Sequence, residues 1–530
     1  MKPSRISSNE TYEEVATPRP VEPFYYAAPH ERTSTNERKK LSMYIVFFYS
    51  LGHVLNDMCA ACWFSYLLLY LEGSQRLSPL EAGIVLFCGQ IFDAIATPVV
   101  GLLSDRSKGW PTLGLGRRKL WNAGGAILVS ICFLGVFSFC VACAISPSVS
   151  SAEKTASFAF FASMFNVGWA AVQVSHMALV PELTPDDGER VLLNSVRYAN
   201  TVLSNCSVFI AMWVILHGQT NIDYDDYDQS TTYQILSFVV LGFGGICSVL
   251  FLIGTPESLT PIETSSKNKS GSSTTSNVIS LNTGTYVRPE IMTWRDWLSM
   301  RSFYQVMIVY SLTRLATNVA QVYLSFFVTA TLKMDQTAIA LVPLLLYIAQ
   351  LTATTVMKKF ARKFGRRNSM TIGALLVAAS CGIMLILTPQ SSNIIYAAMI
   401  VLGIGTSIVM VISVSMQADL IGSNTESGAF VYGAMSFGDK LSNGIAVLAV
   451  QFSGDSILDV DAKGQFIRFV NGFVPLVAIG LATAVCWTIS FPKHLQASNN
   501  DTVQVPLLSD TGSRRSSKAE ALEGILEDKA

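Results

Sequence analysis

The stretch GLLSDRSKGWPTLGLGRRK, residues 101–119, follows a long apolar run and ends in a Gly-Arg-Arg step before its final lysine. Residues 357–369 read MKKFARKFGRRNS, follow another apolar run and contain the same Gly-Arg-Arg step. A basic loop that recurs after the second and after the eighth apolar run indicates an internal repeat. By the positive-inside rule, both loops are expected to face the cytosol.

Composition places this repeat in a membrane. Of the 530 residues, 50% are hydrophobic and 14% are charged, which is too apolar for a soluble chain of this length. A bilayer core needs about 20 apolar residues per helix, whereas a β-barrel needs shorter segments of alternating polarity, which these runs lack. We predict twelve spans, at 43–71, 82–103, 119–145, 155–180, 191–216, 232–254, 303–331, 338–357, 368–388, 393–418, 428–452 and 467–490. The expected fold is an all-α membrane protein, with two pseudo-symmetric six-helix halves around a central cavity.

Polar, low-complexity stretches divide the chain. The acidic loop NIDYDDYDQS, residues 221–230, suits the side opposite the basic loops, and counting helices from these anchors places both termini in the cytosol. The predicted organisation is a disordered cytosolic tail at 1–41, six-helix bundles at 42–255 and 303–491, a cytosolic loop between them at 256–302, and a disordered cytosolic tail at 492–530.

Charged side chains inside the spans indicate where the cavity lies. An Asp, Arg or Lys at a helix centre costs roughly 2.5–3.5 kcal/mol even on the mildest insertion scale, so these residues are expected to face inward. Polar residues also recur every three or four positions, which aligns them on single helix faces. The candidate substrate and coupling residues are His53, Asp57, Asp93, Thr97, Trp169, Gln173, Arg197, Arg314, Tyr432 and Lys440, with Asp439 beside the last.

Each polar residue also has a purely structural interpretation. Asn205 and Asn443 could simply bond neighbouring helices, and His176 could be a buried core histidine. Asp57 and Asp93 are the candidates for coupling transport to protons or cations, because a carboxylate inside a membrane needs a cationic partner or a proton. Arg197 can grip a carboxylate through two parallel hydrogen bonds, so it is the candidate for holding an acidic group or for locking a carboxylate partner, and Lys440 could do either.

A second hypothesis concerns the first basic loop, residues 101–119. Asp105 and Arg106 end one helix, and Arg117 and Arg118 begin the next, so these four residues could form a charged latch between neighbouring helices on the cytosolic face. The alternative is that the cations only set topology.

Other chemistry finds little support in the residues. The ten cysteines lie almost entirely within predicted spans and are expected to pack as small apolar side chains. The pairs Cys59/Cys62 and Cys140/Cys143 allow a metal or redox role, but no further ligands accompany them. We find no phosphate-binding glycine loop, nucleophile elbow or basic nucleic-acid patch, so no enzyme activity and no cofactor, metal or nucleic-acid partner is expected.

Three stretches carry a resemblance to a known family: FDAIATPVVGLLSDRSKGW (92–110), VPELTPDDGERVLLNSVRYA (180–199) and MQADLIGSNTESGAFVYGAMSFGDK (416–440). Together they resemble the glycoside–pentoside–hexuronide branch of the major facilitator superfamily, which includes melibiose-type cation symporters. The resemblance implies that Asp57 lies where that branch binds sugar, and that Asp93 lies at the first acid of its cation site. Thr97 and Gln173 replace other acids of the branch, which argues against a sodium site and against sugar, and favours proton coupling or none.

The stretches GHVLNDMCAACWFSYLLLYL (52–71), GWAAVQVSHMALVPEL (168–183), FYQVMIVYSLTRLATNVAQVYLS (303–325) and SGAFVYGAMSFGDKLSNG (427–444) resemble more specifically an animal subgroup of that family. This resemblance implies a lysosomal and melanosomal membrane protein needed for cysteine import. The residue chemistry fits a small zwitterion, since Asp57 or Asp93 could face an ammonium group while Arg197 faces a carboxylate. Nothing in the sequence reads a thiol. The alternatives are a cation-coupled sugar or organic-anion symporter and a non-transporting membrane scaffold. The tetrapeptide YEEV at Tyr12 has the form of a signal read by lysosomal sorting adaptors.

Overall fold

The computed structural model describes residues 41–145, 148–184, 186–218, 229–257, 292–422, 428–457 and 459–490. These residues are almost wholly helical, and their only β contact is an isolated bridge between Trp110 and Leu115. The predicted tails at 1–41 and 492–530 lie outside the described residues except for Leu41, and of the predicted loop at 256–302 only residues 256–257 and 292–302 are described.

The N-terminal half contains the first six membrane helices and short connecting turns. They are α1 (Met43–Leu51), α2 (Val54–Leu69) with the π turn η1 (Tyr70–Ser74), α3 (Pro79–Arg106), η2 (Pro111–Leu113), α4 (Arg117–Phe137), α5 (Val141–Ile145), α6 (Ser151–Ala178) with α7 (Val180–Leu183), α8 (Asp187–Gly218) and α9 (Gln229–Gly254). Two helices begin at full capping boxes, in which Ser78 pairs with Glu81 and Ser150 with Glu153.

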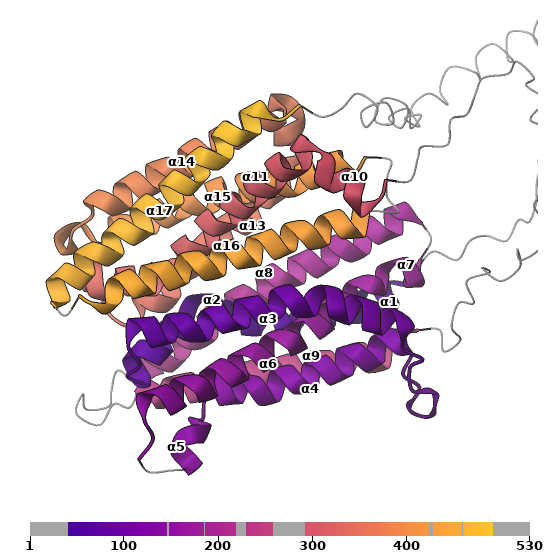
Figure 1. Ribbon diagram of the computed structural model, residues 1–530, viewed down its shortest axis with the longest axis horizontal. Coiled ribbons are helices and arrows are strands. Elements are labelled where there is room, and N and C mark those ends of the chain that lie inside the picture. The colour runs from indigo at the N-terminus through magenta and orange to yellow at the C-terminus, as the bar shows by residue number, and fades with distance from the viewer. Residues whose placement is uncertain are drawn as a thin grey trace, which may run out of the picture. The chain divides into compact units, whose positions relative to one another are not determined.

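The C-terminal half repeats this order. Its helices are α10 (Trp294–Ser299), α11 (Arg301–Val322), α12 (Leu324–Phe326) with the π turn η4 (Phe327–Thr331), α13 (Ala338–Phe364), α14 (Arg366–Ile386), η5 (Pro389–Ser391), α15 (Ile394–Ile421), α16 (Gly428–Asp455) and α17 (Val460–Thr488). Figure 1 shows α16 running beside α3 of the other half, and these two helices pack together.

The repeat extends to backbone detail. The first helix of each half ends in a π turn, closed by the Gln75 amide on the Tyr70 carbonyl and by the Leu332 amide on the Phe327 carbonyl. The next residue in each half, Arg76 or Lys333, has a positive φ of 57° or 51°. Non-glycine residues seldom adopt that region, so its recurrence at matching positions supports a common origin of the two halves.

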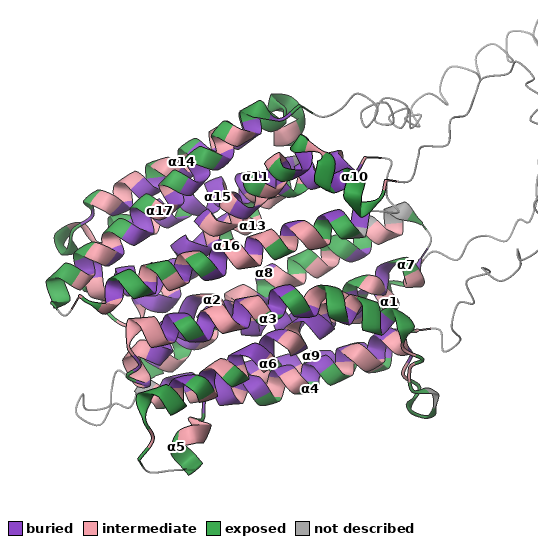
Figure 2. Ribbon diagram, viewed as in Figure 1, coloured by how far each residue is buried: buried purple, intermediate pink, exposed green. Residues whose placement is uncertain are grey.

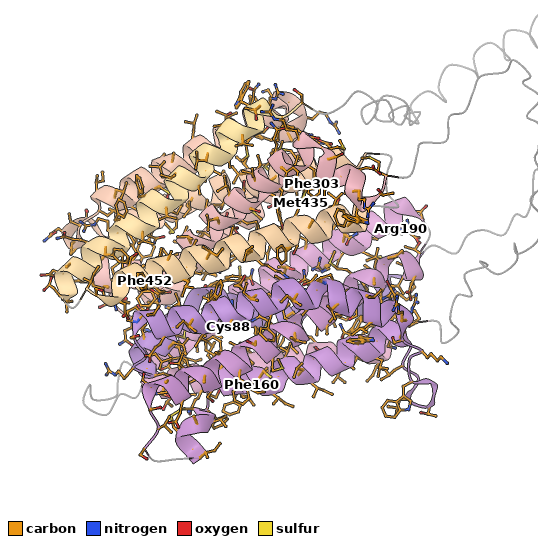
Figure 3. The ribbon with its side chains drawn as sticks, viewed as in Figure 1. Cys88, Phe160, Arg190, Phe303, Met435 and Phe452 are labelled. Carbon is orange, nitrogen blue, oxygen red and sulfur yellow. A yellow bond between two sulfur atoms is a disulfide. The ribbon has the colours of Figure 1, made fainter. Side chains whose placement is uncertain are left out.

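Ten helical segments among the described residues are long and apolar enough to cross a membrane. The other two predicted spans correspond to α11 and α16, which are 22 and 28 residues long. Their sequences are less apolar because they carry Arg314, Asp439 and Lys440, which line the interior. The outer faces are apolar, as shown by Phe160 on α6 and Phe452 on α16, which are 59% and 66% exposed (Figure 3). Figure 2 shows such exposed positions alternating with buried ones along the long helices.

The first and the third predicted spans are interrupted. The first, 43–71, breaks at Gly52 and His53, where a Cβ on Gly52 would lie 2.5 Å from Phe251 and 2.6 Å from the His176 ring. The third, 119–145, ends at Phe137, and α5 follows as a separate turn. Cys140 and Cys143 form a disulfide there, so the expectation that they are only packing residues is wrong for this pair. Cys59 and Cys62 are buried free thiols.

Candidate functional site

A polar cavity of about 410 Å³ lies between the two halves. Helices α2, α3, α6 and α8 line it from one half, and α11, α13, α15 and α16 from the other. Among the sequence-predicted residues, its walls include His53, Asp57, Asp93, Trp169, Gln173, Arg197, Arg314 and Lys440. The volume falls within the range of small-molecule binding sites.

Two of the sequence-predicted residues lie outside this lining. Tyr432, near the start of α16, is 45% exposed and does not line the cavity. Four residues advance a helix by slightly more than one turn, so over the eight positions between Tyr432 and Lys440 the face drifts by about 80°. Thr97 does not line the cavity either, but its hydroxyl accepts a hydrogen bond from Lys440 Nζ at 2.9 Å.

Sequence reasoning missed the contribution of α13 and α15. Tyr347 and Gln350 on α13 and Thr406 and Ser407 on α15 line the cavity. Gln350 Nε2 donates to the Thr406 hydroxyl at 3.0 Å. These spans carry no charged residue at their centres, so the cost of burying charge in a membrane did not single them out. The three-residue spacing of Tyr347 and Gln350 could have done so.

Two ion pairs line the cavity. Lys440 Nζ lies 2.5 Å from Asp93 Oδ1 and so joins α16 to α3 across the two halves. Arg314 Nε lies 3.1 Å from Asp439 Oδ2 within the C-terminal half, and Asn443 Nδ2 donates to Asp439 Oδ1 at 2.7 Å. Asn443 therefore bonds within its own helix. Asp93 is thus paired with a lysine and Asp439 with an arginine.

The third cluster is different. His53 Nδ1 lies 2.9 Å from Asp57 Oδ1, and the Thr201 hydroxyl donates to Asp57 Oδ2 at 2.9 Å. Arg197 Nη2 lies 3.4 Å from His53 Nε2. Within the described chain, Arg197 pairs with no carboxylate, and its buried Nε has no hydrogen-bond partner. Asp57 and Arg197 are thus an anion and a cation, held apart by an imidazole, that face the same space.

His176 and Asn205 resolve into different roles. His176 is fully buried, stacks on Tyr49, and its Nε2 lies 2.8 Å from the Tyr49 carbonyl oxygen, which is the position of a core histidine. Asn205 lines the cavity. Of these two residues, His176 therefore has a structural position and Asn205 a position in the cavity wall.

The end of the bundle that carries the Gly-Arg-Arg loops, called the basic end below, holds a charge cluster. Arg118 pairs with Asp105 at 2.5 Å and with Glu182 at 3.1 Å, and Arg117 pairs with Glu182 at 2.8 Å. These contacts tie α3, α4 and α7 together within one half. Arg106, predicted as a fourth member, is exposed and lies outside the cluster. Glu182 was not predicted. Arg366 pairs with Asp419 at 2.5 Å at the corresponding place in the other half.

The opposite end is closed by contacts between halves. Glu72, in η1, accepts hydrogen bonds from Lys463 Nζ at 2.9 Å and from Gln451 Nε2 at 2.7 Å. The Leu80 amide donates to Asp455 at 3.1 Å, and the Ser325 hydroxyl donates to the Ser65 carbonyl at 3.0 Å. We call Glu72, Gln451 and Lys463 the Glu72 latch.

A twelve-helix membrane fold with a polar cavity between two repeated halves defines a secondary transporter. Comparison with known proteins agrees, because the model of the MFS/sugar transport protein family matches residues 48–465. The chain belongs to this family of the major facilitator superfamily, whose members are transporters.

Individual relatives cover most of the chain. It is 36% identical to the horse and to the human "Major facilitator superfamily domain-containing protein 12", over 87% of this chain and 96% of each relative. Among solved structures, a D-xylose-proton symporter superposes with a TM-score of 0.60 at 16% identity, covering 83% of this chain and 97% of that one. The structural similarity at this identity supports the fold.

Proposed function

We propose that this transporter moves cysteine from the cytosol into the lumen of lysosomes and melanosomes by alternating access, with protons as the coupling ion. The fold and family support transport across a membrane. The choice of cysteine and of the organelle follows the resemblance of the sequence to the lysosomal and melanosomal subgroup. The choice of a zwitterionic substrate has a separate basis in the cavity.

The observation that carries the proposal is that Asp57 and Arg197 remain when the other charged side chains lining the cavity are paired. Among the described residues, the cavity is lined by three aspartates and three Lys or Arg residues, and two of these aspartates pair with two of these cations. Asp57 and Arg197 remain, on either side of His53. An amino acid brings one ammonium and one carboxylate, so it can complete both without leaving a charge unpaired. A sugar brings neither.

The contacts between halves support the direction of access. The Glu72 latch closes one end, so the cavity is reached from the basic end. The positive-inside rule assigns the basic end to the cytosol, together with both termini. Cysteine would enter from the cytosol, and rocking of the two halves would break the latch and expose the cavity to the lumen.

Delivery to lysosomes would depend on sorting adaptors that read Tyr12, a residue outside the described part of the chain. Replacing Tyr12 with Ala should shift the protein toward the plasma membrane in microscopy of intact cells. Unchanged lysosomal localisation would remove Tyr12 from the proposal without affecting the transport site.

The decisive experiment is uptake of radiolabelled cysteine by isolated lysosomes or by vesicles that contain the purified protein. Arg197→Gln should lower uptake at least about tenfold, because a lost charge-assisted hydrogen bond is worth about 1.5–3 kcal/mol. Arg301→Gln is the matched control, because Arg301 is exposed at the start of α11. Excess D-xylose should not compete. No uptake by the unmodified protein, or full uptake by Arg197→Gln, would refute the proposal.

A further inference from the structure

The protonation state of His53 follows from its two neighbours. A guanidinium group only donates hydrogen bonds, so His53 Nε2 must accept from Arg197 Nη2, 3.4 Å away. The hydrogen of the ring is then on Nδ1, from which it is donated to Asp57 Oδ1 at 2.9 Å. In this conformation His53 is a neutral imidazole, and among the described residues the Asp57 carboxylate pairs with no Lys or Arg.

A second proton on His53 would change both contacts. It would occupy Nε2 and point a donor at another donor on Arg197, which removes that hydrogen bond and places two cations side by side. It would also give Asp57 a cationic partner. All three aspartates of the cavity would then be paired with a cation, namely Asp93 with Lys440, Asp439 with Arg314 and Asp57 with the imidazolium.

The surroundings of His53 make its contacts sensitive to a second proton. His53 sits in the break between α1 and α2, where the chain leaves helical geometry, and it is 4% exposed. The titratable or charged groups that face it are Asp57 from α2, Arg197 from α8 and His176 from α6, whose ring centroid lies 5.7 Å away. Tyr49 of α1 stacks on the ring of His176. Only Asp57 among these groups is an anion able to stabilise a second proton.

We propose that His53 is the proton-coupling residue, and that a proton on His53 competes with the ammonium group of the substrate for the single carboxylate of Asp57. Proton and amine therefore exchange instead of travelling together. The inference rests on the proposed function for the identity of the amine substrate. In a neutral cytosol, neutral His53 leaves the Asp57 carboxylate open to the ammonium group of the substrate. In an acidic lumen, a proton on His53 displaces that ammonium group, which drives amino acids from the cytosol into the lumen.

Cysteine binding to the purified protein tests the inference. With one competing proton, apparent affinity should fall as the pH is lowered from about 7.5 to about 5.5, with a limiting slope of about tenfold per pH unit. His53→Gln, which keeps a donor toward Asp57 and cannot gain a proton, should show no such fall. His217→Gln is the matched control, since His217 ends α8 outside the cavity lining and should behave like the unmodified protein. A His53→Gln variant that keeps the full pH dependence would overturn the inference.

A substrate-free measurement separates the two proposals. Histidine-selective ¹⁵N nuclear magnetic resonance reports the tautomer and charge of each ring, and the His53 signal is the one that disappears in His53→Gln. We expect a neutral ring protonated on Nδ1 at about pH 7.5 that gains a proton on acidification. If the unmodified protein binds no cysteine at any pH, the proposed function fails and this spectrum decides the role of His53. A ring that is doubly protonated at neutral pH, or that never titrates, contradicts it.

Discussion

Removing the charge of Glu72 should shift the balance between the two ends of the transporter. The Glu72 side chain is 8% exposed and accepts one charged and one neutral hydrogen bond from the opposite half. In Glu72→Gln the ammonium of Lys463 loses its anion. A hydrogen bond to a charged group is worth about 1.5–3 kcal/mol, and 1.4 kcal/mol is a factor of ten in an equilibrium constant. The closed state of this end should therefore lose about 10- to 100-fold in relative population.

Spin-label distances measured between α3 and α17 near this end would report the shift as a longer-distance population. The matched control is Lys333→Gln, because Lys333 pairs with Asp461 at the same end, but both side chains are well exposed, at 60% and 77%, and both belong to one half. Such a pair contributes at most about 1 kcal/mol and should leave the distances unchanged. Equal effects of Glu72→Gln and Lys333→Gln, or no effect of either, would refute the latch.

Two further predictions concern stability in detergent. Gly52→Ala should lower the free energy of unfolding by about 1–3 kcal/mol, because its Cβ would overlap two rings, whereas Gly245→Ala, with nothing within 4 Å, should be neutral or slightly stabilising; thermal unfolding of both would check this, and equal midpoints would contradict it. Asp439→Asn should cost about 1–3 kcal/mol by leaving Arg314 without its anion, less than for a fully buried pair since Arg314 is 30% exposed, and adding Arg314→Gln should restore part of the loss. Additive effects in that double-mutant cycle would count against the pair.

The class of fold and the position of the cavity were predictable because both follow from the cost of polar groups in hydrocarbon. Asp57, Asp93, Arg197 and Lys440 stand out as charges within apolar runs, and only an interior cavity accommodates them. The family match and the structural similarity confirm the twelve-helix fold. The roles of the individual cavity residues stay predictions that the experiments above address.

The pairing of charges could not be predicted, since it depends on how distant helices meet. Glu72 and Lys463 are 391 positions apart, and Lys440 lies 343 positions from Thr97. The four-residue spacing of His53 and Asp57 indicated a common helix face, but not that the helix would break at His53 or that Arg197 would meet its other nitrogen. The disulfide between Cys140 and Cys143 was likewise hidden, because the helix ends before it at Phe137.

The π turns η1 and η4, at the ends of the first and seventh membrane helices, each contain one more residue than an α-helical turn would. An α-helix turns about 100° and rises 1.5 Å per residue. Rewinding η1 into α geometry would therefore screw the segment that carries Glu72 around its axis and swing the carboxylate away from Lys463. The same motion in η4 would pull the Thr331 hydroxyl from the Gly464 carbonyl on α17, 2.8 Å away. A one-residue change of winding would thus break the contact between halves at Glu72 and, in the C-terminal half, the contact between η4 and α17.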